Sequence, residues 1–217
     1  CQQLATWRHQ LATAQKLKIS LNLSVRQLQS DTLLDQFNQV LQSTGIPPEA
    51  LTLEITESLL VQNFEATHQL LSEVQARGIH ISIDDFGTGY SSLSYLHRLP
   101  VDALKIDQAF VSYMGQDAKN QTIAESIIAL SNVLGLNAIA EGIETVDQLQ
   151  WLQTHGCEYG QGYLFSRPIP ADAVVPLLKT DLNRLIPSHY RRLPIAEAGH
   201  VPPVGPVADN GPNQGGQ

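Results

Sequence analysis

Short apolar runs recur along the chain, and most of them end in a polar or acidic residue. They are rich in Ile and Leu, or they alternate apolar and polar residues with the period of two that is typical of β-strands. The pattern predicts six strands, at residues 19–24, 51–56, 80–85, 103–107, 137–142 and 162–166.

The segments between these strands have helical spacing. They predict helices at residues 31–45, 63–78, 118–135 and 145–156. Each of these segments ends in a glycine, which is the expected left-handed stop signal of a helix. The last segment opens with a capping box that pairs Thr145 with Gln148.

Strands that alternate with helices predict a parallel sheet, because parallel neighbours need a crossover connection. Both a doubly wound sheet and a (β/α)8 TIM-type barrel have this order. The first carries a G-x-G-x-x-G fingerprint after its first strand, and the sequence has none. The second gathers polar residues at the carboxyl ends of its strands, as this sequence does, so the barrel is the preferred α/β fold.

The barrel is expected to be incomplete. About six βα units are visible in the sequence, whereas a closed barrel has eight, so the first two strands would lie before Cys1. The opening "CQQLATWRHQ" also resembles the middle of a helix, which predicts that the chain was cut from something longer. Residues 1–185 are assigned to the partial barrel. Residues 186–217, rich in Pro and Gly, are expected to form a disordered tail.

Composition narrows the possible partners. The net charge is −8 without a basic run, which argues against a nucleic-acid polymer or an anionic membrane surface as partner. A small anionic ligand stays possible if a metal ion lies between it and the protein. Cys1 and Cys157 form no framework and no apolar run could span a bilayer, so a cytoplasmic location is expected.

Five side chains with oxygen donors stand at the ends of the predicted strands: Asn22, Glu54, Asp84, Asp85 and Glu141. Such a set suits hard cations, namely Mg²⁺, Mn²⁺ or Ca²⁺. Because one Mg²⁺ usually takes fewer protein ligands, two ions about 3.5–4 Å apart are expected, as in enzymes that displace groups at phosphorus. The neighbouring acids Asp84 and Asp85 could stay ionised together beside such ions.

Other polar residues could support this site. Lys105 would orient a water or neutralise charge on a phosphate, and Asp107 could hold Lys105 in place. Glu57 could accept hydrogen bonds from the turn that follows Asp85, and Glu144 could do the same for the loop after Glu141. Each of these residues alone could also be a helix cap or a solvated loop residue without a functional role. Asp85, for example, could cap a helix that starts near Tyr90.

The ordered motifs "LNLSVRQL", "LTLEITES", "IDDFGTGYSSLSYL", "LKIDQAFV", "IAEGIET" and "YGQGYLFSRPIP" resemble those of the EAL-domain cyclic di-GMP phosphodiesterases. The resemblance covers about Cys1 to Pro170. It implies a (β/α)8-type barrel that cleaves cyclic di-GMP to linear pGpG with two Mg²⁺ or Mn²⁺ ions.

Carried over position by position, the resemblance implies specific roles. Metal ligands would be Asn22, Glu54, Asp84 and Asp85, joined by Glu141 as a metal-linked acid and general base. Lys105 would contact the water or a phosphate oxygen, and Gln161 would lie near the metals and the substrate. Glu57 would support the loop after Asp84, which in the family links metal binding to formation of a homodimer.

The sequence departs from the family at one point, since it has no Glu-Ala-Leu motif. A chain without that glutamate is expected to be inactive or very weak by itself. Upstream sensory or diguanylate-cyclase domains are possible partners in a longer protein. Two alternatives stay open: a non-catalytic receptor that binds cyclic di-GMP, and a structural or dimerisation module in which the acids only cap helices.

Overall fold

The computed structural model describes residues 1–28, 30, 32–57, 64–89, 96–114 and 117–179. The predicted tail at 186–217 and the predicted helix start near Tyr90 lie outside these residues. Among the described helices, none is long and apolar enough to cross a membrane.

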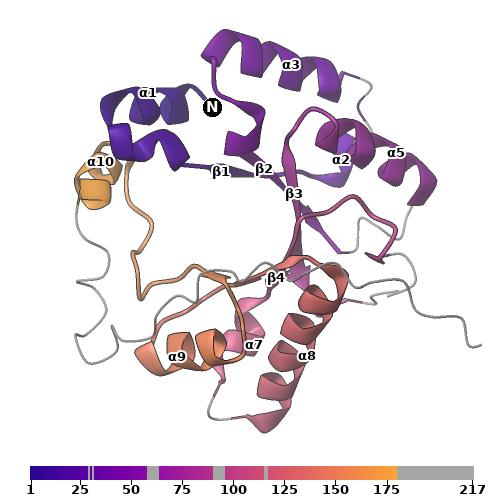
Figure 1. The fold of residues 1–217 in the computed structure, drawn as a ribbon, viewed down its shortest axis with the longest axis vertical. Helices are drawn as coiled ribbons and strands as arrows, with labels where there is room; N and C mark the ends of the chain where they lie inside the picture. The colour runs from indigo at the N-terminus through magenta and orange to yellow at the C-terminus, as the bar shows by residue number, and fades with distance from the viewer. Residues whose placement is uncertain (29, 31, 58–63, 90–95, 115–116, 180–217) are drawn as a thin grey trace, which may run out of the picture.

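The described strands form one parallel sheet whose spatial order follows the chain. Helices cover its outer side, and the sheet curls into a half-barrel that is open between its first and last strands (Figure 1). The α/β barrel-type fold predicted from the sequence is thereby confirmed. The strands are β1 (Ile19–Asn22), β2 (Leu51–Thr56), β3 (His80–Phe86), β4 (Ala103–Ile106), β5 (Asn137–Ala140) and β6 (Tyr159–Gly160).

Alternation along the strands divides the sheet into an apolar outer side and a polar inner side. In β2, Leu51, Leu53 and Ile55 are fully buried, whereas Thr52 and Glu54 between them are only partly buried. Strand side chains alternate between faces, so the leucines pack towards the helices while Glu54 faces the inside of the curl. The hydrophobic core thus lies between the sheet and the helices, and polar side chains such as Glu54 lie on the inner side of the sheet.

The helices follow the predicted boundaries closely. The longest of the described helices is α8 (Ala118–Leu134), and it ends at Gly135 in the left-handed conformation with φ +69°. The capping box of Thr145 and Gln148 opens α9 (Val146–Thr154) as predicted. The other helical elements are α1 (Gln2–Gln10), η1 (Ala12–Lys16), α2 (Val25–Leu28), α3 (Leu33–Thr44), η2 (Pro48–Ala50), α5 (Phe64–Gln75), α7 (Gln108–Ser112) and α10 (Ala171–Lys179).

The prediction of a strand at residues 162–166 is wrong. The sixth strand is β6 at Tyr159–Gly160, and the chain turns immediately after it, with Phe165 N–H donating to Gly162 O at 3.1 Å. Both residues of β6 are exposed, so this strand leaves no hydrophobic signal in the sequence. Leu164 and Phe165, which suggested a strand, instead pack against the core from within the turn.

The two cysteines are free and differ in exposure, since Cys1 is partly exposed and Cys157 is buried. Cys157 is 7% exposed and its Sγ donates to Tyr159 O at 3.3 Å; burial raises the pKa of this thiol to about 11. Because the thiolate is the reactive form, a thiol reagent at neutral pH should modify Cys1 quickly and Cys157 only after unfolding. Counting labelled thiols by mass spectrometry, with and without denaturant, tests this. Two fast thiols in the native protein would contradict it.

Candidate active site

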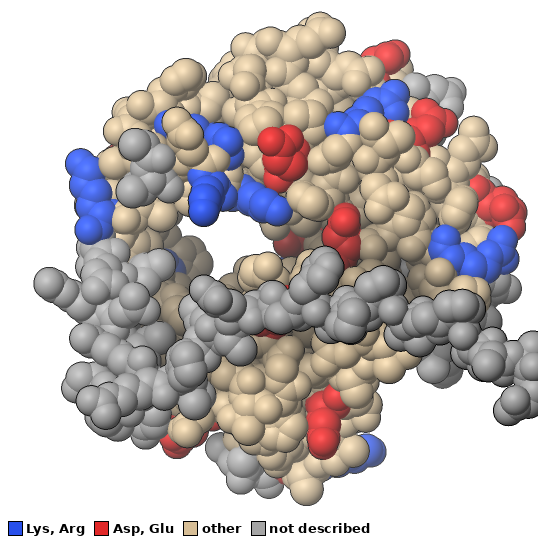
Figure 2. All heavy atoms as spheres, in the orientation of Figure 1, with Lys and Arg blue, Asp and Glu red and all other residues tan. Residues whose placement is uncertain are grey.

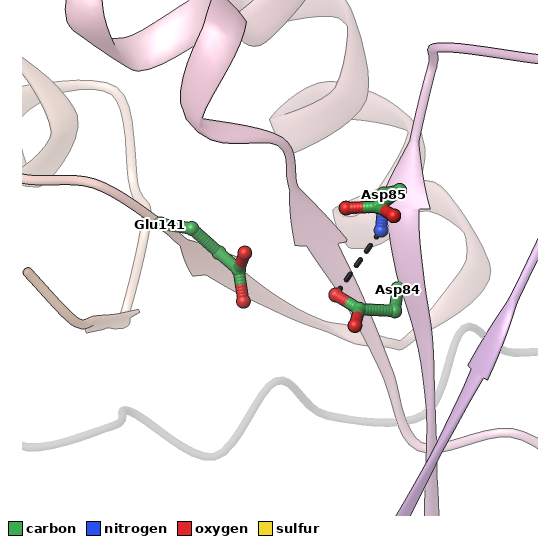
Figure 3. Close-up of side chains that lie close together, drawn as sticks. All are labelled: Asp84, Asp85 and Glu141. Atoms are coloured by element: carbon green, nitrogen blue, oxygen red, sulfur yellow. Dashed lines mark hydrogen bonds between the residues drawn. The ribbon is translucent and has the colours of Figure 1, made fainter. Parts of the chain in front are cut away.

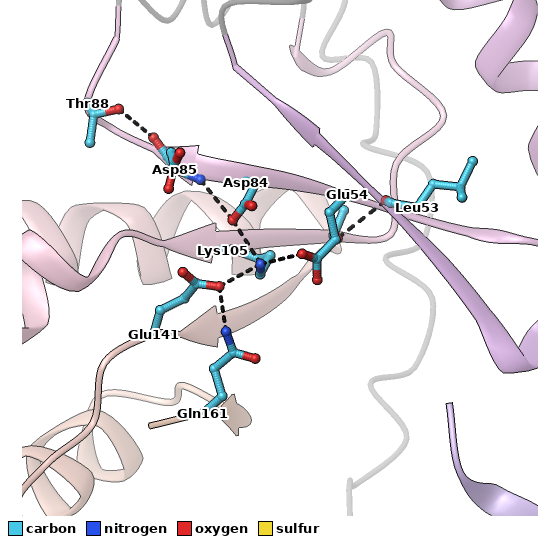
Figure 4. Close-up of polar contacts among 9 residues, drawn as sticks. Leu53, Glu54, Asp84, Asp85, Thr88, Lys105, Glu141 and Gln161 are labelled. Carbon is cyan, nitrogen blue, oxygen red and sulfur yellow. Dashed lines mark hydrogen bonds and ion pairs between the residues drawn. The ribbon is translucent and has the colours of Figure 1, made fainter. Parts of the chain in front are cut away.

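Four strands bring acidic and basic side chains to one end of the curled sheet (Figure 4). Glu54 lies in β2, Asp84 and Asp85 in β3, Lys105 in β4, and Glu141 follows β5 directly. The parallel register places Thr56 beside Asp84, and Glu141 N–H donates to Ile106 O at 3.1 Å. The carboxyl ends of neighbouring strands therefore present their polar residues to the same space, as the sequence predicted.

Lys105 is the centre of the group. Its side chain is 4% exposed, and its Nζ lies 2.8 Å from Glu54 Oε2, 2.8 Å from Asp84 Oδ1 and 2.5 Å from Glu141 Oε1. Burial alone would lower the pKa of this ammonium, but the hydrogen bonds to the three acids outweigh burial and raise the pKa above its ordinary value. Lys105 is thus a fixed positive charge among three carboxylates.

Asp84, Asp85 and Glu141 form a group that could hold a metal ion. One oxygen from each carboxylate lies within 4.8 Å of the other two (Figure 3). Burial raises the pKa of Glu141 although Lys105 opposes the shift; the pKa of Asp85 is also raised, by burial and by its neighbours Asp107 and Asp84. Carboxylates this close together repel one another, so a bound cation would stabilise their charged forms. Their oxygens are the donors that Mg²⁺ and Mn²⁺ prefer.

A local irregularity in β3 explains how two adjacent acids reach the same site. Neighbouring residues of a regular strand point to opposite faces. The pairing of β3 with β4 shifts register between Ile83 and Phe86, and Asp85 has φ +54°. Such bulges re-aim side chains next to functional sites. Asp85 therefore turns back towards Asp84, whose Oδ1 accepts from Asp85 N–H at 3.1 Å.

Asn22 lies near this group without joining it. It ends β1 in register with Glu54, and its side chain is exposed. Among the described residues it has no hydrogen bond to the acids. The structure thus places Asn22 at the expected edge of the sheet, and its ligand role stays a prediction.

Asp107 does not contact Lys105 as the sequence suggested. Its side chain accepts from Ala109 N–H at 2.7 Å, which caps α7. Because β4 ends at Ile106, Asp107 has left the strand and does not follow Lys105 to the inner side.

Glu57 supports the turn after Asp85. Its side chain is 5% exposed, and its Oε2 accepts from Gly87 N–H at 3.1 Å. Its Oε1 is buried without a hydrogen-bond partner among the described residues. A Cβ at Gly89 would lie 3.0 Å from that oxygen, so the turn and the carboxylate pack closely.

Gln161 contacts Glu141, and Glu144 lies in the loop that follows Glu141. Gln161 Nε2 donates to Glu141 Oε1 at 2.8 Å, which holds that carboxylate in place. The side chain of Glu144 is exposed and has no hydrogen bond within the described part of the chain. The loop after Glu141 is held instead by buried Gln148, whose Oε1 accepts from Glu144 N–H at 2.8 Å. The sequence showed Gln148 only as part of a capping box.

A cavity of about 510 Å³ opens beside Glu141 and Gln161. Tyr163 and Arg167 line it, and the Arg167 guanidinium stands 4.4 Å above the centre of the Tyr163 ring. In the space-filling view this face of the molecule is hollowed near its centre, with both basic and acidic side chains beside the hollow (Figure 2). The acidic group therefore borders a space that could receive a small molecule.

The fold and the site define an α/β barrel-type protein with a group of carboxylates that could hold a cation at the carboxyl ends of its strands. Comparison with protein families matches residues 1–168 to the EAL domain. The chain therefore belongs to the EAL domain family, as its motifs suggested.

Individual relatives agree with this assignment. The chain is 42% identical over 169 residues to the cyclic di-GMP phosphodiesterase NbdA of Pseudomonas aeruginosa, and the match covers 78% of this chain and 22% of NbdA. The chain thus spans about a fifth of that relative's length.

Solved structures show the same fold. A structure described as "PaMucR Phosphodiesterase, c-di-GMP complex" has a TM-score of 0.76 and 39% identity, covering 80% of this chain and 70% of that one. A manganese and cyclic di-GMP complex of Klebsiella pneumoniae BlrP1 has a TM-score of 0.67 and 31% identity, covering 76% and 42%.

Proposed function

We propose that this chain forms the catalytic part of a cyclic di-GMP phosphodiesterase, which hydrolyses its substrate to linear pGpG. The observation that carries the proposal is the meeting of Asp84, Asp85 and Glu141 within 4.8 Å, around the buried ammonium of Lys105. Relatives whose names state this activity support the substrate. The manganese complex of BlrP1 supports the metal.

Two Mg²⁺ or Mn²⁺ ions would be held by Asp84, Asp85, Glu141 and Glu54, with Asn22 at the edge. When bound, such ions lower the pKa of a water molecule and neutralise charge on a phosphate. Glu141 acts as general base, in a carboxylate position that Gln161 and Lys105 fix by hydrogen bonds. Lys105 offers a positive charge to the phosphoryl oxygens, and Glu57 keeps the turn after Asp85 in shape.

The partners in this proposal are cyclic di-GMP and a second copy of the chain. Dimerisation through the segment after Asp85 rests on the resemblance to the family, and residues 90–95 of that segment lie outside the described part. A cytoplasmic location is proposed because both cysteines are free.

The cavity beside Glu141 would receive one guanine base, because Tyr163 offers an aromatic face there. Stacking of a base on an aromatic side chain contributes about 1–3 kcal/mol. Tyr163→Ala is therefore expected to weaken cyclic di-GMP binding about 5- to 150-fold by calorimetry. Tyr113→Ala serves as the control, because Tyr113 is exposed and lies outside the cavity lining. Equal affinities for the two variants would contradict this assignment.

The activity itself is tested by chromatographic detection of pGpG. The assay uses this chain and a longer polypeptide that adds an upstream segment with the Glu-Ala-Leu motif. Hydrolysis by the longer polypeptide is expected with Mg²⁺ or Mn²⁺ and is expected to stop when EDTA removes the ion, whereas this chain alone is expected to show little or none. Tight binding of cyclic di-GMP by the longer polypeptide without any turnover would select the receptor instead.

A further inference from the structure

Gln148 is a buried polar side chain that the proposed reaction does not use. It lies in α9 (Val146–Thr154), and its side chain is 7% exposed. Its Oε1 accepts from Glu144 N–H at 2.8 Å and from Thr145 N–H at 2.9 Å. Its Nε2 donates to Val111 O at 3.1 Å. A capping box explains the bond to Thr145 but not the one to Val111.

The bond to Val111 connects the loop after Glu141 to the end of α7. Val111 is fully buried, and it is 37 positions away from Gln148 in the sequence. The same helix also packs against the turn after Asp85, because a Cβ at Gly87 would lie 3.1 Å from Cε2 of Phe110 in α7. Helix α7 therefore stands as a short spacer between the loop that carries Glu141 and the strand end that carries Asp85.

The loop after Glu141 and helix α7 also pack closely against each other. Gly142 has φ +71°, and a Cβ at this position would lie 2.6 Å from the Cβ of Gln108 at the start of α7. From the other side, Ile143 N–H donates to Gln161 O at 3.1 Å. The loop after Glu141 is thus held between α7 and the segment after β6.

We propose that Gln148 is a positioning residue for the cation site. Through α7 it sets the separation between the carboxylates of Glu141 and Asp85, which must bind the same ions. The proposal rests on the proposed function in one respect, namely that these acids bind a metal.

Gln148→Glu separates the two roles of this side chain. A carboxylate still accepts from Glu144 N–H and Thr145 N–H, and Glu is itself a common capping-box residue. It cannot donate to Val111 O when ionised. If capping is the only role, Gln148→Glu behaves like the unchanged protein; if Gln148 ties the loop to α7, the site changes. Gln150→Glu, at an exposed position of the same helix, is the matched control.

Calorimetry with Mn²⁺ on the folded 217-residue chain provides the measurement. Supporting hydrogen bonds around metal ligands typically change affinity about 10- to 100-fold. Because Gln148 acts through a helix, about a tenfold loss of affinity is expected, with no loss for Gln150→Glu. Equal Mn²⁺ affinity in Gln148→Glu and the control overturns the inference and leaves the proposed function intact.

A second pair of variants covers the case in which Gln148→Glu does not fold. Gly142→Ala presses a methyl group onto Gln108, whereas a methyl group at Gly135, which has φ +69°, would meet nothing within 4 Å. Both substitutions carry the same backbone strain, so only Gly142→Ala moves α7. Its Mn²⁺ affinity is expected to fall several-fold below that of Gly135→Ala, and equal affinities overturn the inference.

Hydrogen exchange tests the tie to α7 without any metal. Residues 108–112 and 141–145 are expected to exchange faster in Gln148→Glu than in Gln150→Glu, and equal rates overturn the inference. Failure of the unchanged chain to bind Mn²⁺ counts against the proposed function instead, so the two failures are distinguishable.

Discussion

Replacing Glu141 with glutamine is expected to lower the rate of cyclic di-GMP hydrolysis by about 10²- to 10⁴-fold, the usual contribution of a general base. A glutamine keeps an acceptor oxygen for Lys105 Nζ and for Gln161 Nε2, both of which bond Glu141 Oε1 in the structure. It cannot take up a proton from water, and it removes one negative charge from the proposed cation site. Folding should therefore persist while chemistry is lost.

Steady-state kinetics on the longer, EAL-bearing polypeptide measures this effect. The loss should appear mainly in kcat, since Glu141 is proposed to act on water and not on a base of the substrate. Glu125→Gln removes the same charge from an exposed position of α8 and serves as the control. A Glu141→Gln variant that retained the full rate would rule out Glu141 as general base.

The strands that the sequence predicted best are those whose own residues alternate. In β2, Leu51, Leu53 and Ile55 are buried and alternate with Thr52 and Glu54. This alternation predicts both the strand and the face of the sheet to which Glu54 points. Strand β6 could not be found this way, because both of its residues are exposed. It joins the sheet by backbone pairing with β5, next to the hydrogen bond from Gln161 N–H to Ala140 O.

In the site, too, features set by the local sequence were predictable, whereas contacts between residues far apart in the sequence were not. Glu54, Asp84 and Glu141 lie together around Lys105 because neighbouring parallel strands end at the same edge of the sheet. The partner of Asp107 was predicted wrongly, since the end of β4 at Ile106 decides which way Asp107 points. The bond from Gln148 to Val111 spans 37 positions, and no local pattern encodes it. Long-range contacts depend on how helices pack, and that follows from the whole fold.

Lys105→Met is expected to destabilise the metal-free protein by about 3–5 kcal/mol, the usual result of removing one partner from a buried ion pair. The ammonium lies within hydrogen-bonding distance of Glu54, Asp84 and Glu141, whose side chains are only 10–16% exposed. Without it, three carboxylates would face one another with no cation between them. Urea unfolding in the presence of EDTA measures the loss, and Lys119→Met at an exposed position of α8 should change stability little.

Two further measurements link this loss to the site itself. Adding Glu54→Gln to Lys105→Met should recover part of the stability, because one of the uncompensated charges disappears and the two substitutions are coupled. Added Mg²⁺ should stabilise Lys105→Met more than the unchanged protein, since an ion that binds only the folded chain supplies the missing positive charge. If Lys105→Met and Lys119→Met were equally stable in EDTA, Lys105 would not be the charge that holds these acids together.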